Sequence, residues 1–252
     1  MKALVLAAGR GSRLGEHSEQ HNKCMLRLFG KPLVQYSLEN AVRVNVDEIV
    51  VVVGYRAEEI INEFGNRFEG VRVQYVIQHD PKGLVHAIEC SRNALGDSDF
   101  MLFLADEILH RPRHPEMIQA FRDQNLFVVC GVVQESNAEE IRKTYAVIQN
   151  DADRRVYRLI EKPRRPPNRI RGTGNCIFRS AILEYLELTP TNPHRHEKEL
   201  PDLIQCAIDD GHAVVSFDIG AAYININSPE DIAIAERTGS LIVEGAKAGG
   251  TG

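Results

Sequence analysis

Short apolar runs alternate with longer amphipathic stretches over residues 1–104. The apolar runs predict strands at Ala3–Ala8, Glu48–Val53, Val71–Gln78 and Phe100–Leu104. The amphipathic stretches predict helices at Lys31–Val44, Ala57–Phe64 and Leu84–Ala94. Because the run Ile49–Val53 is apolar throughout, we expect that strand to be covered on both faces. The repeated strand, helix, strand order predicts a Rossmann-like α/β fold with a mostly parallel sheet flanked by helices.

The regular alternation of strands and helices ends after residue 110. Further strands are predicted at Leu126–Val133, Tyr145–Gln149, Val156–Glu161 and Ala213–Phe217. Further helices are predicted at Met117–Asp123, Ala181–Leu186, Leu200–Asp210 and Pro229–Thr238. The segment Pro163–Arg171 carries two consecutive prolines and is expected to be irregular. We expect one domain over residues 1–240, in which 1–110 and 111–240 form two halves, the second a smaller antiparallel lobe, followed by a disordered tail at 241–252.

Composition and charge exclude several classes of protein. Among the 252 residues, 30 Lys and Arg face 35 Asp and Glu, a net charge of -5, which disfavours nucleic-acid binding. No apolar run approaches the ~20 residues of a membrane span. The N-terminal apolar run continues into Gly9 instead of a cleavage site, so it reads as a strand and not as a secretion signal. We therefore expect no nucleic-acid partner and no membrane association.

Cysteine and histidine usage gives no sign of a disulfide framework or a zinc site. The five cysteines are scattered and form no Cys-x-x-Cys pair, which fits a reducing cytoplasm. Four histidines cluster near acidic residues but lack the spacing of metal ligands. We expect these four to be solvated loop residues: His110, His114, His194 and His196.

The turn after the first predicted strand is rich in small residues. It reads Leu6-Ala7-Ala8-Gly9-Arg10-Gly11-Ser12-Arg13-Leu14. Glycines without a Cβ let backbone N–H groups approach an anion, so phosphate is the expected ligand. A dinucleotide-binding fingerprint needs Gly or Ala where Leu14 stands, and a P-loop needs Gly-Lys-Ser/Thr where Ser12-Arg13 stands. Both of those motifs are excluded. Arg13 and the following Lys23 together suit a polyphosphate chain.

The order of the motifs resembles the sugar-phosphate nucleotidyltransferase family, in particular glucose-1-phosphate thymidylyltransferases and uridylyltransferases. The resemblance covers residues 1 to about 235. It is carried by the glycine-rich turn, Lys23, Gly30-Lys31-Pro32-Leu33, Gln78 with Gly83-Leu84-Val85-His86-Ala87, Leu104-Ala105-Asp106, Glu161-Lys162-Pro163, Thr173-Gly174-Asn175 and Ile226-Asn227-Ser228-Pro229-Glu230-Asp231. The family's reaction is attack by a sugar-phosphate oxygen on the α-phosphorus of a nucleoside triphosphate, which releases pyrophosphate.

The resemblance implies a role for each nucleotide-side residue. The residues Leu6, Ala7, Ala8, Gly9, Arg10, Gly11, Ser12 and Arg13 are expected to wrap the triphosphate. Arg13 and Lys23 are expected to be catalytic, drawing charge from the phosphates. Gln78 and Gly83 match positions that read one edge of a pyrimidine. Because purine-using relatives tend to carry Thr-Ala where Leu84-Val85 stands, UTP or dTTP is favoured.

The resemblance also implies a metal site and an acceptor site. Asp106 is expected to be catalytic and to hold Mg²⁺, a cation that prefers oxygen ligands. Asn225 stands where the family has the second aspartate ligand, with Asn227 as its substitute. Lys162 is expected to be catalytic by binding the sugar phosphate, and Glu161 to bind sugar hydroxyls. The remaining expected acceptor contacts are Tyr145, Ala146, Thr173, Gly174 and Asn175.

The expected protein is a cytoplasmic, Mg²⁺-dependent enzyme that makes a nucleoside diphosphate sugar by direct displacement, without a covalent intermediate. Residues 1–110 are the expected nucleotide-binding half and 111–240 the acceptor-binding half. Alternatives within the class are a cytidylyltransferase for a phospho-alcohol and an enzyme for a cyclitol phosphate, which Asn225 and Ala146 keep open. A non-catalytic nucleotide-binding regulator is the alternative from another class. A homo-oligomer is a family expectation only.

Overall fold

A ten-stranded sheet forms the centre of the protein. The computed structural model describes residues 1–9, 11, 22–228 and 230–237. Within these ranges the strands of the large sheet are β1 (Lys2–Ala7), β4 (Glu48–Val53), β5 (Arg67–Phe68), β6 (Val71–Ile77), β7 (Phe100–Leu104), β9 (Val128–Gln134), β10 (Tyr145–Gln149), β11 (Val156–Glu161), β12 (Ile170–Phe178) and β13 (Val214–Asp218). Two short ladders join β2 (Arg27–Leu28) to β3 (Lys31–Pro32) and β8 (Glu107–His110) to β14 (Ala222–Asn225).

The first half of the sheet is parallel in its interior. Strands β7, β1, β4 and β6 run parallel in this order, and Leu4 of β1 is paired with Val50 of β4 and Leu102 of β7. Strand β12 then pairs antiparallel with β7 and carries the sheet into the second half, where it also pairs antiparallel with β9 and β10. The two halves are therefore joined through one continuous sheet. The α/β fold with a central parallel sheet is confirmed.

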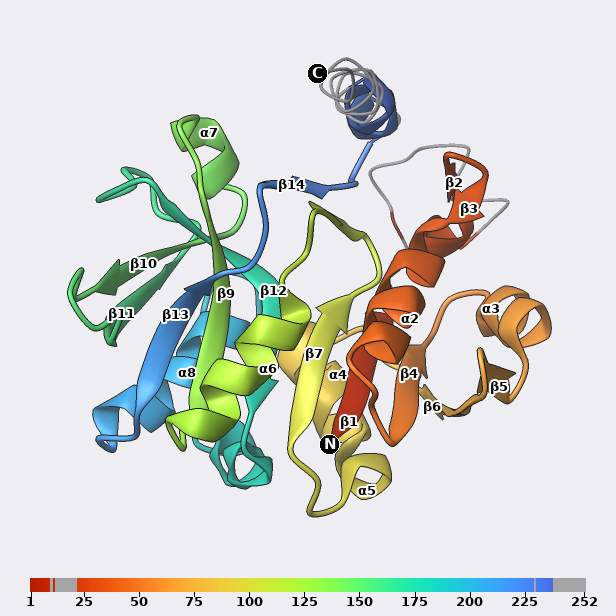
Figure 1. Cartoon of the computed structure of the whole chain (residues 1–252), viewed down its shortest axis with the longest axis horizontal. Coiled ribbons are helices and arrows are strands. Elements are labelled where there is room, and N and C mark those ends of the chain that lie inside the picture. The colour runs from red at the N-terminus through yellow and green to blue at the C-terminus, as the bar shows by residue number, and fades with distance from the viewer. Residues whose placement is uncertain (10, 12–21, 229, 238–252) are drawn as a thin grey trace, which may run out of the picture.

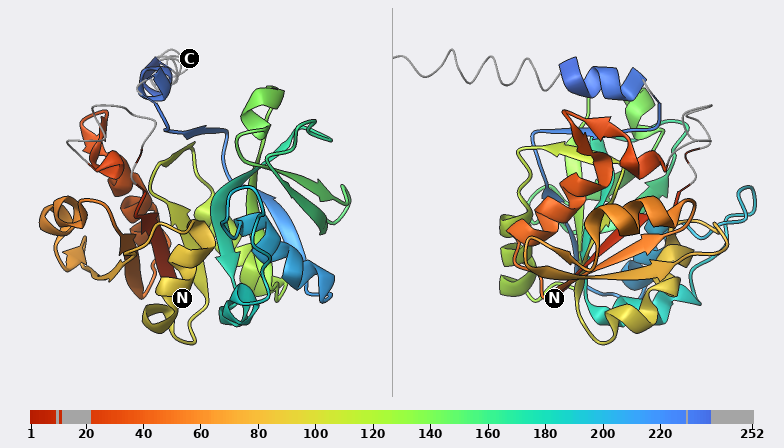
Figure 2. Two further views of the ribbon diagram at one scale, coloured as in Figure 1. Left: turned by 180° about the vertical axis from the view of Figure 1, so that it is seen from behind. Right: turned by 90° about the vertical axis from the view of Figure 1, so that its right-hand side faces the viewer.

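Helices cover both faces of the sheet. They are α2 (Leu33–Arg43), α3 (Ala57–Phe64), α4 (Leu84–Cys90), α5 (Arg92–Leu95), α6 (His114–Asp123), α7 (Ala138–Ile141) and α8 (Leu200–Asp209), with 3₁₀ helices η2 (Lys23–Met25) and η3 (Ser180–Leu186). Figure 1 shows α2 and α6 in front of the sheet, and the left view of Figure 2 shows α4, α5 and α8 on the opposite face. Strand β1 alternates between the two layers, since Leu4 packs in one core with Ile88 and Leu203, and Val5 in the other with Leu38.

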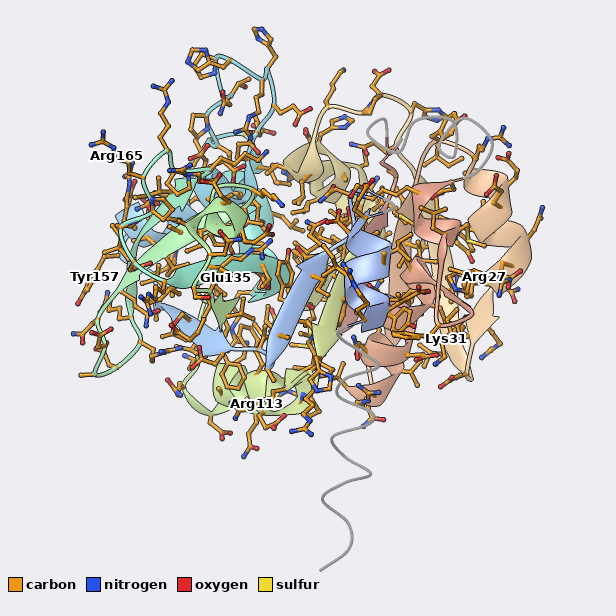
Figure 3. All side chains as sticks on the ribbon, turned by 90° about the horizontal axis from the view of Figure 1, so that it is seen from above. Arg27, Lys31, Arg113, Glu135, Tyr157 and Arg165 are labelled. Atoms are coloured by element: carbon orange, nitrogen blue, oxygen red, sulfur yellow. The ribbon has the colours of Figure 1, made fainter. Side chains whose placement is uncertain are left out.

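The two halves occupy opposite sides of the molecule. Seen from above in Figure 3, the labelled side chains of Arg27 and Lys31 from the first half lie on one side. Those of Tyr157 and Arg165 from the second half lie on the other. Between them, the carboxyl ends of the parallel strands meet at one edge, which is where open α/β sheets bind ligands. That edge contains the candidate site.

Several predicted elements need correction. The helix predicted at Leu84–Ala94 is interrupted at Ser91, whose hydroxyl donates to the carbonyl of Ile88 at 2.7 Å and so competes with the helical pattern. The irregular segment predicted to extend to Arg171 ends earlier, because β12 begins at Ile170. Strand β12 itself was not predicted, since its two glycines and its buried polar residues hide the apolar pattern.

Candidate active site

Two adjoining cavities lie at this edge of the sheet, and the larger of the pair opens at the carboxyl ends of β1 and β7. Its volume is about 460 Å³. The residues of the expected nucleotide and metal site that line it are Leu6, Ala8, Gly9, Gly11, Lys23, Gln78, Gly83 and Asp106. Ala7 is buried in the core behind the wall. Arg10, Ser12 and Arg13 lie outside the described residues, so their expected phosphate contacts stay predictions.

Lys23 reaches the larger cavity from a short buried turn. Asn22, which has no exposed surface, precedes η2, and its Oδ1 accepts a hydrogen bond from the Cys24 N–H at 2.8 Å. The Asn22 Nδ2 donates to the carbonyl of Tyr55 at 2.7 Å, which ties the turn to the end of β4. Gly11 lies against the Lys23 stem, since a Cβ at Gly11 would stand 2.7 Å from the Lys23 Cβ. The position of the ammonium group is therefore fixed by backbone and buried contacts.

The ammonium group of Lys23 joins two oxygens from distant parts of the chain. Its Nζ lies 2.6 Å from Oδ2 of Asp106 and 3.1 Å from Oδ1 of Asn227. The Lys23 side chain is 8% exposed and that of Asp106 is 26% exposed, so solvent screens this pair little. Burial and the nearby Asp106 carboxylate raise the pKa of the Cys24 thiol to about 12, which keeps it protonated and unreactive. Among the described residues, one carboxylate and one amide oxygen thus meet at the Lys23 ammonium group.

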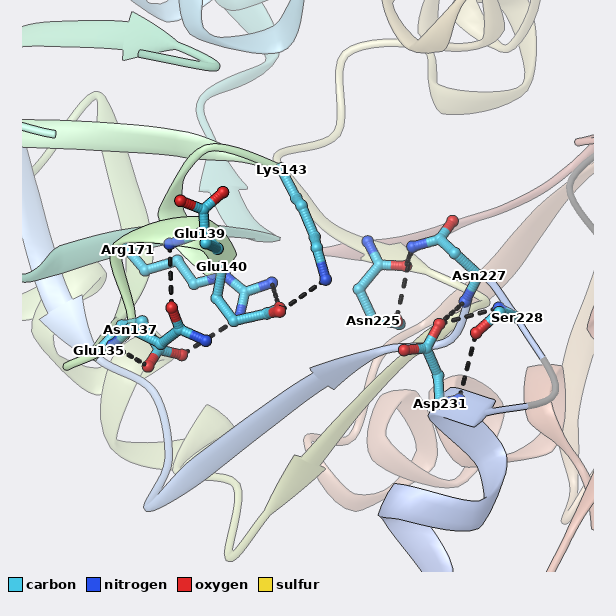
Figure 4. A network of polar contacts seen from close by, with 10 residues as sticks. All are labelled: Glu135, Asn137, Glu139, Glu140, Lys143, Arg171, Asn225, Asn227, Ser228 and Asp231. Carbon is cyan, nitrogen blue, oxygen red and sulfur yellow. Dashed lines mark hydrogen bonds and ion pairs between the residues drawn. The ribbon is translucent and has the colours of Figure 1, made fainter. Parts of the chain in front are cut away.

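Asn227 is held in place by its neighbours. Figure 4 shows that its backbone N–H and that of Ser228 both donate to Oδ2 of Asp231, each at 2.8 Å. The Asn227 Nδ2 donates to Oδ1 of Asn225 at 2.8 Å, which leaves the Asn227 Oδ1 directed at Lys23. The Ser228 and Asp231 contacts form the N-terminal cap of the helix at 230–237. Of the two asparagines, Asn227 lines the larger cavity and Asn225 the smaller one.

Gln78 and Gly83 lie next to each other in the wall of the larger cavity. Gln78 follows β6 and is 7% exposed, and its backbone N–H donates to the carbonyl of Val53 at 2.8 Å. Its Nε2 lies 3.1 Å from the carbonyl oxygen of Gly83 and 2.9 Å from Nδ1 of His86. Gly83 has φ 91°, a conformation open to glycine and unfavourable for other residues. The expected partners of a nucleobase are therefore brought together, with His86 as an additional member that was not expected.

The smaller cavity adjoins the larger one. It has a volume of about 190 Å³, and Leu84 and Leu104 line both cavities. The expected acceptor residues on its wall are Tyr145, Glu161, Lys162, Thr173 and Gly174. Two expected contacts are not brought to this wall. Ala146 is fully buried in β10, and the amide of Asn175 is engaged behind the wall by Glu107 and His114.

Glu161 and Lys162 stand at the end of β11 in an unusual local conformation. Lys162 has φ 42°, rare for a residue with a side chain, and its N–H donates to the carbonyl of Thr144 at 2.7 Å. Burial raises the pKa of Glu161, while the hydrogen bond that Arg195 donates to its Oε1 at 3.0 Å lowers it. The Lys162 Nζ lies 3.4 Å from the same oxygen and is 37% exposed, so it remains accessible to an anion.

Glu107 was not predicted as a site residue. It lines the smaller cavity and joins it to strand β14, which carries Tyr223 and Asn225. Its carboxylate accepts hydrogen bonds from the Tyr223 hydroxyl at 2.6 Å, from the Gly174 N–H at 2.9 Å and from Asn175 Nδ2 at 2.9 Å. Burial raises the pKa of Glu107 to about 7, and the hydrogen bond from Tyr223 opposes that rise. The sequence does show a second carboxylate directly after Asp106. The apolar and polar pattern alone does not distinguish such a residue from an ordinary glutamate in a turn.

The expectation of solvated loop residues was wrong for two of the four histidines. His110 is the last residue of strand β8 and is half-buried. His114 is the first residue of α6 and has no exposed surface, whereas His194 and His196 are exposed as expected. The His114 Nε2 lies 2.9 Å from Oδ1 of Asn175, and burial lowers the pKa of His114 to about 4. The imidazole is therefore neutral at neutral pH and supports Asn175 from behind.

A second polar network lies beside the smaller cavity, whose wall it reaches through Lys143. Figure 4 shows Arg171 between Glu135 and Glu140, with ion-pair distances of 3.3 Å to each carboxylate, and Lys143 paired with Glu140. The Arg171 guanidinium also lies over the Tyr223 ring, 4.5 Å from its centroid. Since Arg171 is 1% exposed, these contacts compensate for burying its charge.

Two absences hold for the described part of the chain. No helix there combines the length and the apolar composition that a membrane span requires. No group of three or more His, Cys, Asp and Glu side chains converges on a common metal position there. A structural zinc or calcium cage is thus not found in those ranges, whereas Mg²⁺ typically takes only one or two protein ligands and completes its shell with phosphates and water.

Similarity to known proteins extends over nearly the whole chain. The chain is 32% identical to a UTP–glucose-1-phosphate uridylyltransferase of Haloferax volcanii, over 94% of this chain and 96% of that protein. It is 30% identical to a low-salt glycan biosynthesis nucleotidyltransferase of the same organism, over 92% of this chain but only 64% of that protein. The fold matches a UTP-bound UGPase from Acinetobacter baumannii with a TM-score of 0.82, at 21% identity, covering 94% of this chain and 92% of that one.

The family assignment follows from these matches. The model of the nucleotidyl transferase family matches residues 2–226, which include every lining residue of the two cavities except Asn227. The uridylyltransferase relative passes 30% identity and is covered almost completely. The chain belongs to the nucleotidyl transferase family.

Proposed function

We propose that this protein transfers a nucleoside monophosphate from a nucleoside triphosphate to a sugar 1-phosphate, giving a nucleoside diphosphate sugar and pyrophosphate. The observation that carries the proposal is the pair of adjoining cavities at one sheet edge. The larger contains Lys23 and Asp106, the smaller contains Glu161 and Lys162, and Leu84 and Leu104 form a shared wall. Two substrates bound side by side there would meet at that wall, as group transfer between them requires.

The residues of the chain supply alignment and charge neutralisation. In the larger cavity, Lys23 offers a fixed cation to the α-phosphate, where negative charge grows during displacement. In the smaller cavity, Lys162 offers an accessible cation to the sugar phosphate, and Glu161 accepts hydrogen bonds from sugar hydroxyls. Direct displacement requires no nucleophile from the protein. The buried, protonated Cys24 thiol is consistent with this proposal.

Mg²⁺ fits the residues at the edge of the larger cavity. The Asp106 and Asn227 oxygens already converge on one cationic atom, the Lys23 Nζ, so the donor set suits a hard cation. We assign Asp106 and Asn227 as the protein ligands, with Asn225 either orienting Asn227 or taking its place. When bound, the ion would neutralise phosphate charge and polarise the α-phosphoryl group.

UTP or dTTP is the proposed donor. The uridylyltransferase relative is named for UTP and glucose 1-phosphate, and it is matched along almost its full length. The relative named for low-salt glycan biosynthesis extends well beyond this chain, so its full activity is not carried over. A cytoplasmic location and a homo-oligomeric state stay predictions, as does the division of roles between residues 1–110 and 111–240. The expected tail at 241–252 lies outside the described residues.

A direct test combines the protein with Mg²⁺, one nucleoside triphosphate and one phosphorylated sugar, and follows pyrophosphate. A panel of glucose, galactose, mannose and N-acetylglucosamine 1-phosphates, with phosphocholine and an inositol phosphate as rivals, would identify the acceptor class. Release that depends on a sugar 1-phosphate supports the proposal. Release only with phosphocholine or the inositol phosphate would move the enzyme to one of the alternative classes, and nucleotide binding without release from any pair would favour a regulator.

A further inference from the structure

The amide of Gln78 is held by two acceptors. Its Nε2 lies 3.1 Å from the Gly83 carbonyl oxygen and 2.9 Å from Nδ1 of His86. A carbonyl oxygen can only accept, so the Gln78 group that faces Gly83 must be the NH₂. Its second hydrogen is then directed at the His86 Nδ1, which accepts it when the imidazole is neutral with its proton on Nε2. Turning the amide over would set the Gln78 Oε1 against the Gly83 carbonyl oxygen.

This arrangement decides which atom the cavity meets. With both Nε2 hydrogens in use, Gln78 presents Oε1 to the larger cavity, and that oxygen accepts no hydrogen bond from any described residue. Gly83 lines the same cavity, and its N–H donates to no acceptor within the described ranges. This part of the cavity wall therefore offers one acceptor from a side chain that is 7% exposed and one donor from the backbone. A buried donor and acceptor of this kind select for a matching partner.

The matching edge belongs to bases with a keto group beside a ring N–H. Uracil and thymine present O4 beside N3–H, and guanine presents O6 beside N1–H. Cytosine and adenine present an amino group beside an unprotonated ring nitrogen. In this cavity their amino group would face the Gly83 N–H and their ring nitrogen would face the Gln78 oxygen, so both contacts would be repulsive.

We propose that His86 is a positioning residue that sets base specificity, because it holds the Gln78 amide in the orientation that accepts keto bases and rejects amino bases. The inference rests on the proposed function and deepens it, by excluding CTP and ATP as donors. His86 acts through Gln78 and does not itself line the cavity. It lies on α4, three residues after Gly83, and so joins the two residues that face the base.

Glu197 is a second polar group that could determine which base binds, and it would do so with the opposite preference. Its Oε2 lies 3.0 Å from the place of a Cβ at Gly83, so a carboxylate stands close to the same part of the cavity wall. A carboxylate accepts from amino groups and would favour cytosine or adenine instead. If Glu197 set the base preference, the wild type would prefer amino bases and Glu197→Gln would lose that preference. We expect a preference for keto bases in both proteins, since Gln78 and His86 are unchanged.

The experiment measures kcat/KM for UTP, dTTP, GTP, CTP and ATP with one accepted sugar 1-phosphate, for the wild type, His86→Phe and His86→Gln. We expect the wild type to favour the best keto nucleotide over CTP by about 100-fold or more. His86→Phe, which removes the acceptor, should reduce that ratio about tenfold through the nucleotide KM, with the acceptor KM unchanged. His86→Gln, whose side-chain oxygen can accept, should restore most of the ratio. His79→Phe is the control, because His79 is exposed next to Gln78.

The outcomes separate this inference from the proposed function. Equal use of UTP and CTP by the wild type would overturn the inference, as would an unchanged ratio in a folded His86→Phe protein. If no pair of substrates releases pyrophosphate, the proposed function fails. The inference is then decided by calorimetric binding of UTP and CTP to the same proteins, since base preference in binding does not need turnover. Circular dichroism spectra establish whether each variant folds. If His86→Phe does not fold, the comparison is made with His86→Gln alone.

Discussion

Asp106 and Glu107 are consecutive residues that serve different cavities. The Asp106 carboxylate lies in the larger cavity, 2.6 Å from the Lys23 ammonium, whereas Glu107 lines the smaller one and receives the Tyr223 hydroxyl at 2.6 Å. Asp106 is partly exposed and ready to meet a ligand, while Glu107 is 7% exposed and surrounded by hydrogen-bond donors. The same functional group is therefore open to the cavity at one position and engaged by hydrogen-bond donors at the next.

Lys23→Ala should abolish most of the catalysis without unfolding the protein. Loss of a fixed cation at the α-phosphate costs about 3 to 4 kcal/mol of transition-state stabilisation, or roughly 100- to 1000-fold in kcat. Steady-state pyrophosphate release measures the loss. Lys31→Ala is the control, since Lys31 lies on the exposed β2–β3 hairpin, pairs with Glu39 of α2 and lines neither cavity. Near wild-type turnover in Lys23→Ala would remove Lys23 from the mechanism.

Asn227→Ala should raise the Mg²⁺ concentration needed for half-maximal turnover more than Asn225→Ala does. The reason is that the Asn227 oxygen stands beside Asp106 around one cation, while Asn225 acts by accepting from Asn227. Asn225→Asp keeps that hydrogen bond and adds negative charge, so it should lower the requirement. Mg²⁺ titrations of initial rate check all three variants. A larger effect of Asn225→Ala would reverse the assignment of the second ligand.

Lys162→Ala should weaken binding of the sugar phosphate and leave nucleotide binding intact. A charge-assisted hydrogen bond is worth about 1.5 to 3 kcal/mol, which corresponds to roughly a 10- to 100-fold higher KM for the acceptor. The KM for the nucleotide should change little, because Lys162 lines only the smaller cavity. Arg158→Ala, an exposed cation on the same strand, is the matched control. An equal rise in both KM values would contradict the separation of the two cavities.

His114 should make the folded protein sensitive to acid. Its pKa is lowered to about 4 in the fold from 6.5, so the folded state binds fewer protons and stability falls as pH decreases from 6.5 to 4. Glu107 acts in the opposite direction. Its pKa is raised to about 7 from 4.5, so its contribution is present below pH 4.5 and is lost as pH rises to 7.

The His114 contribution is therefore seen in the difference between the wild type and His114→Gln. The free energy of unfolding, measured with urea at several values of pH between 4 and 7.5, should fall more steeply with acid in the wild type, by up to about 1.4 kcal/mol per pH unit. His194→Gln, at an exposed histidine, should follow the wild type. Parallel curves for the wild type and His114→Gln would show that His114 does not titrate as the buried contact requires.

Gly172→Ala should disrupt the smaller cavity. A Cβ at Gly172 would stand 2.0 Å from Cε2 of Tyr145, whose hydroxyl donates to the Thr173 carbonyl at 2.8 Å. Overpacking of this kind costs about 1 to 3 kcal/mol of folding free energy. In a double-mutant cycle with Tyr145→Leu, which removes the ring edge, the two losses should be less than additive. Additive losses in urea unfolding would show that the two residues do not clash.

The sequence was most informative where apolar residues follow each other without interruption. The observed bounds of Glu48–Val53, Phe100–Leu104, Tyr145–Gln149 and Val156–Glu161 are those predicted, as are those of the helix Ala57–Phe64. Strand β12 escaped prediction because its burial depends on partners distant in sequence. Arg171 becomes buried only through Glu135 and Glu140, and Asn175 only through Glu107 and His114. Pattern analysis cannot anticipate such pairings.

In the candidate site, too, some residues could be predicted from the sequence and others could not. Motif order predicted Lys23, Asp106, Gln78 and Gly83, because each follows a strand or begins a helix at the expected edge. It did not predict the residues that hold them. Asn22 anchors the Lys23 turn, and His86 fixes the Gln78 amide, through contacts that exist only once the chain is folded.

Leu84 and Leu104 each line both binding spaces. A ligand that presses on either leucine from one side alters the surface offered to the ligand on the other. Occupancy of the two spaces is then thermodynamically linked, and the factor by which the first substrate changes the affinity of the second must equal the factor in reverse. Replacing either leucine with alanine would weaken this reciprocal effect, so the affinity for each substrate would depend less on whether the other is bound.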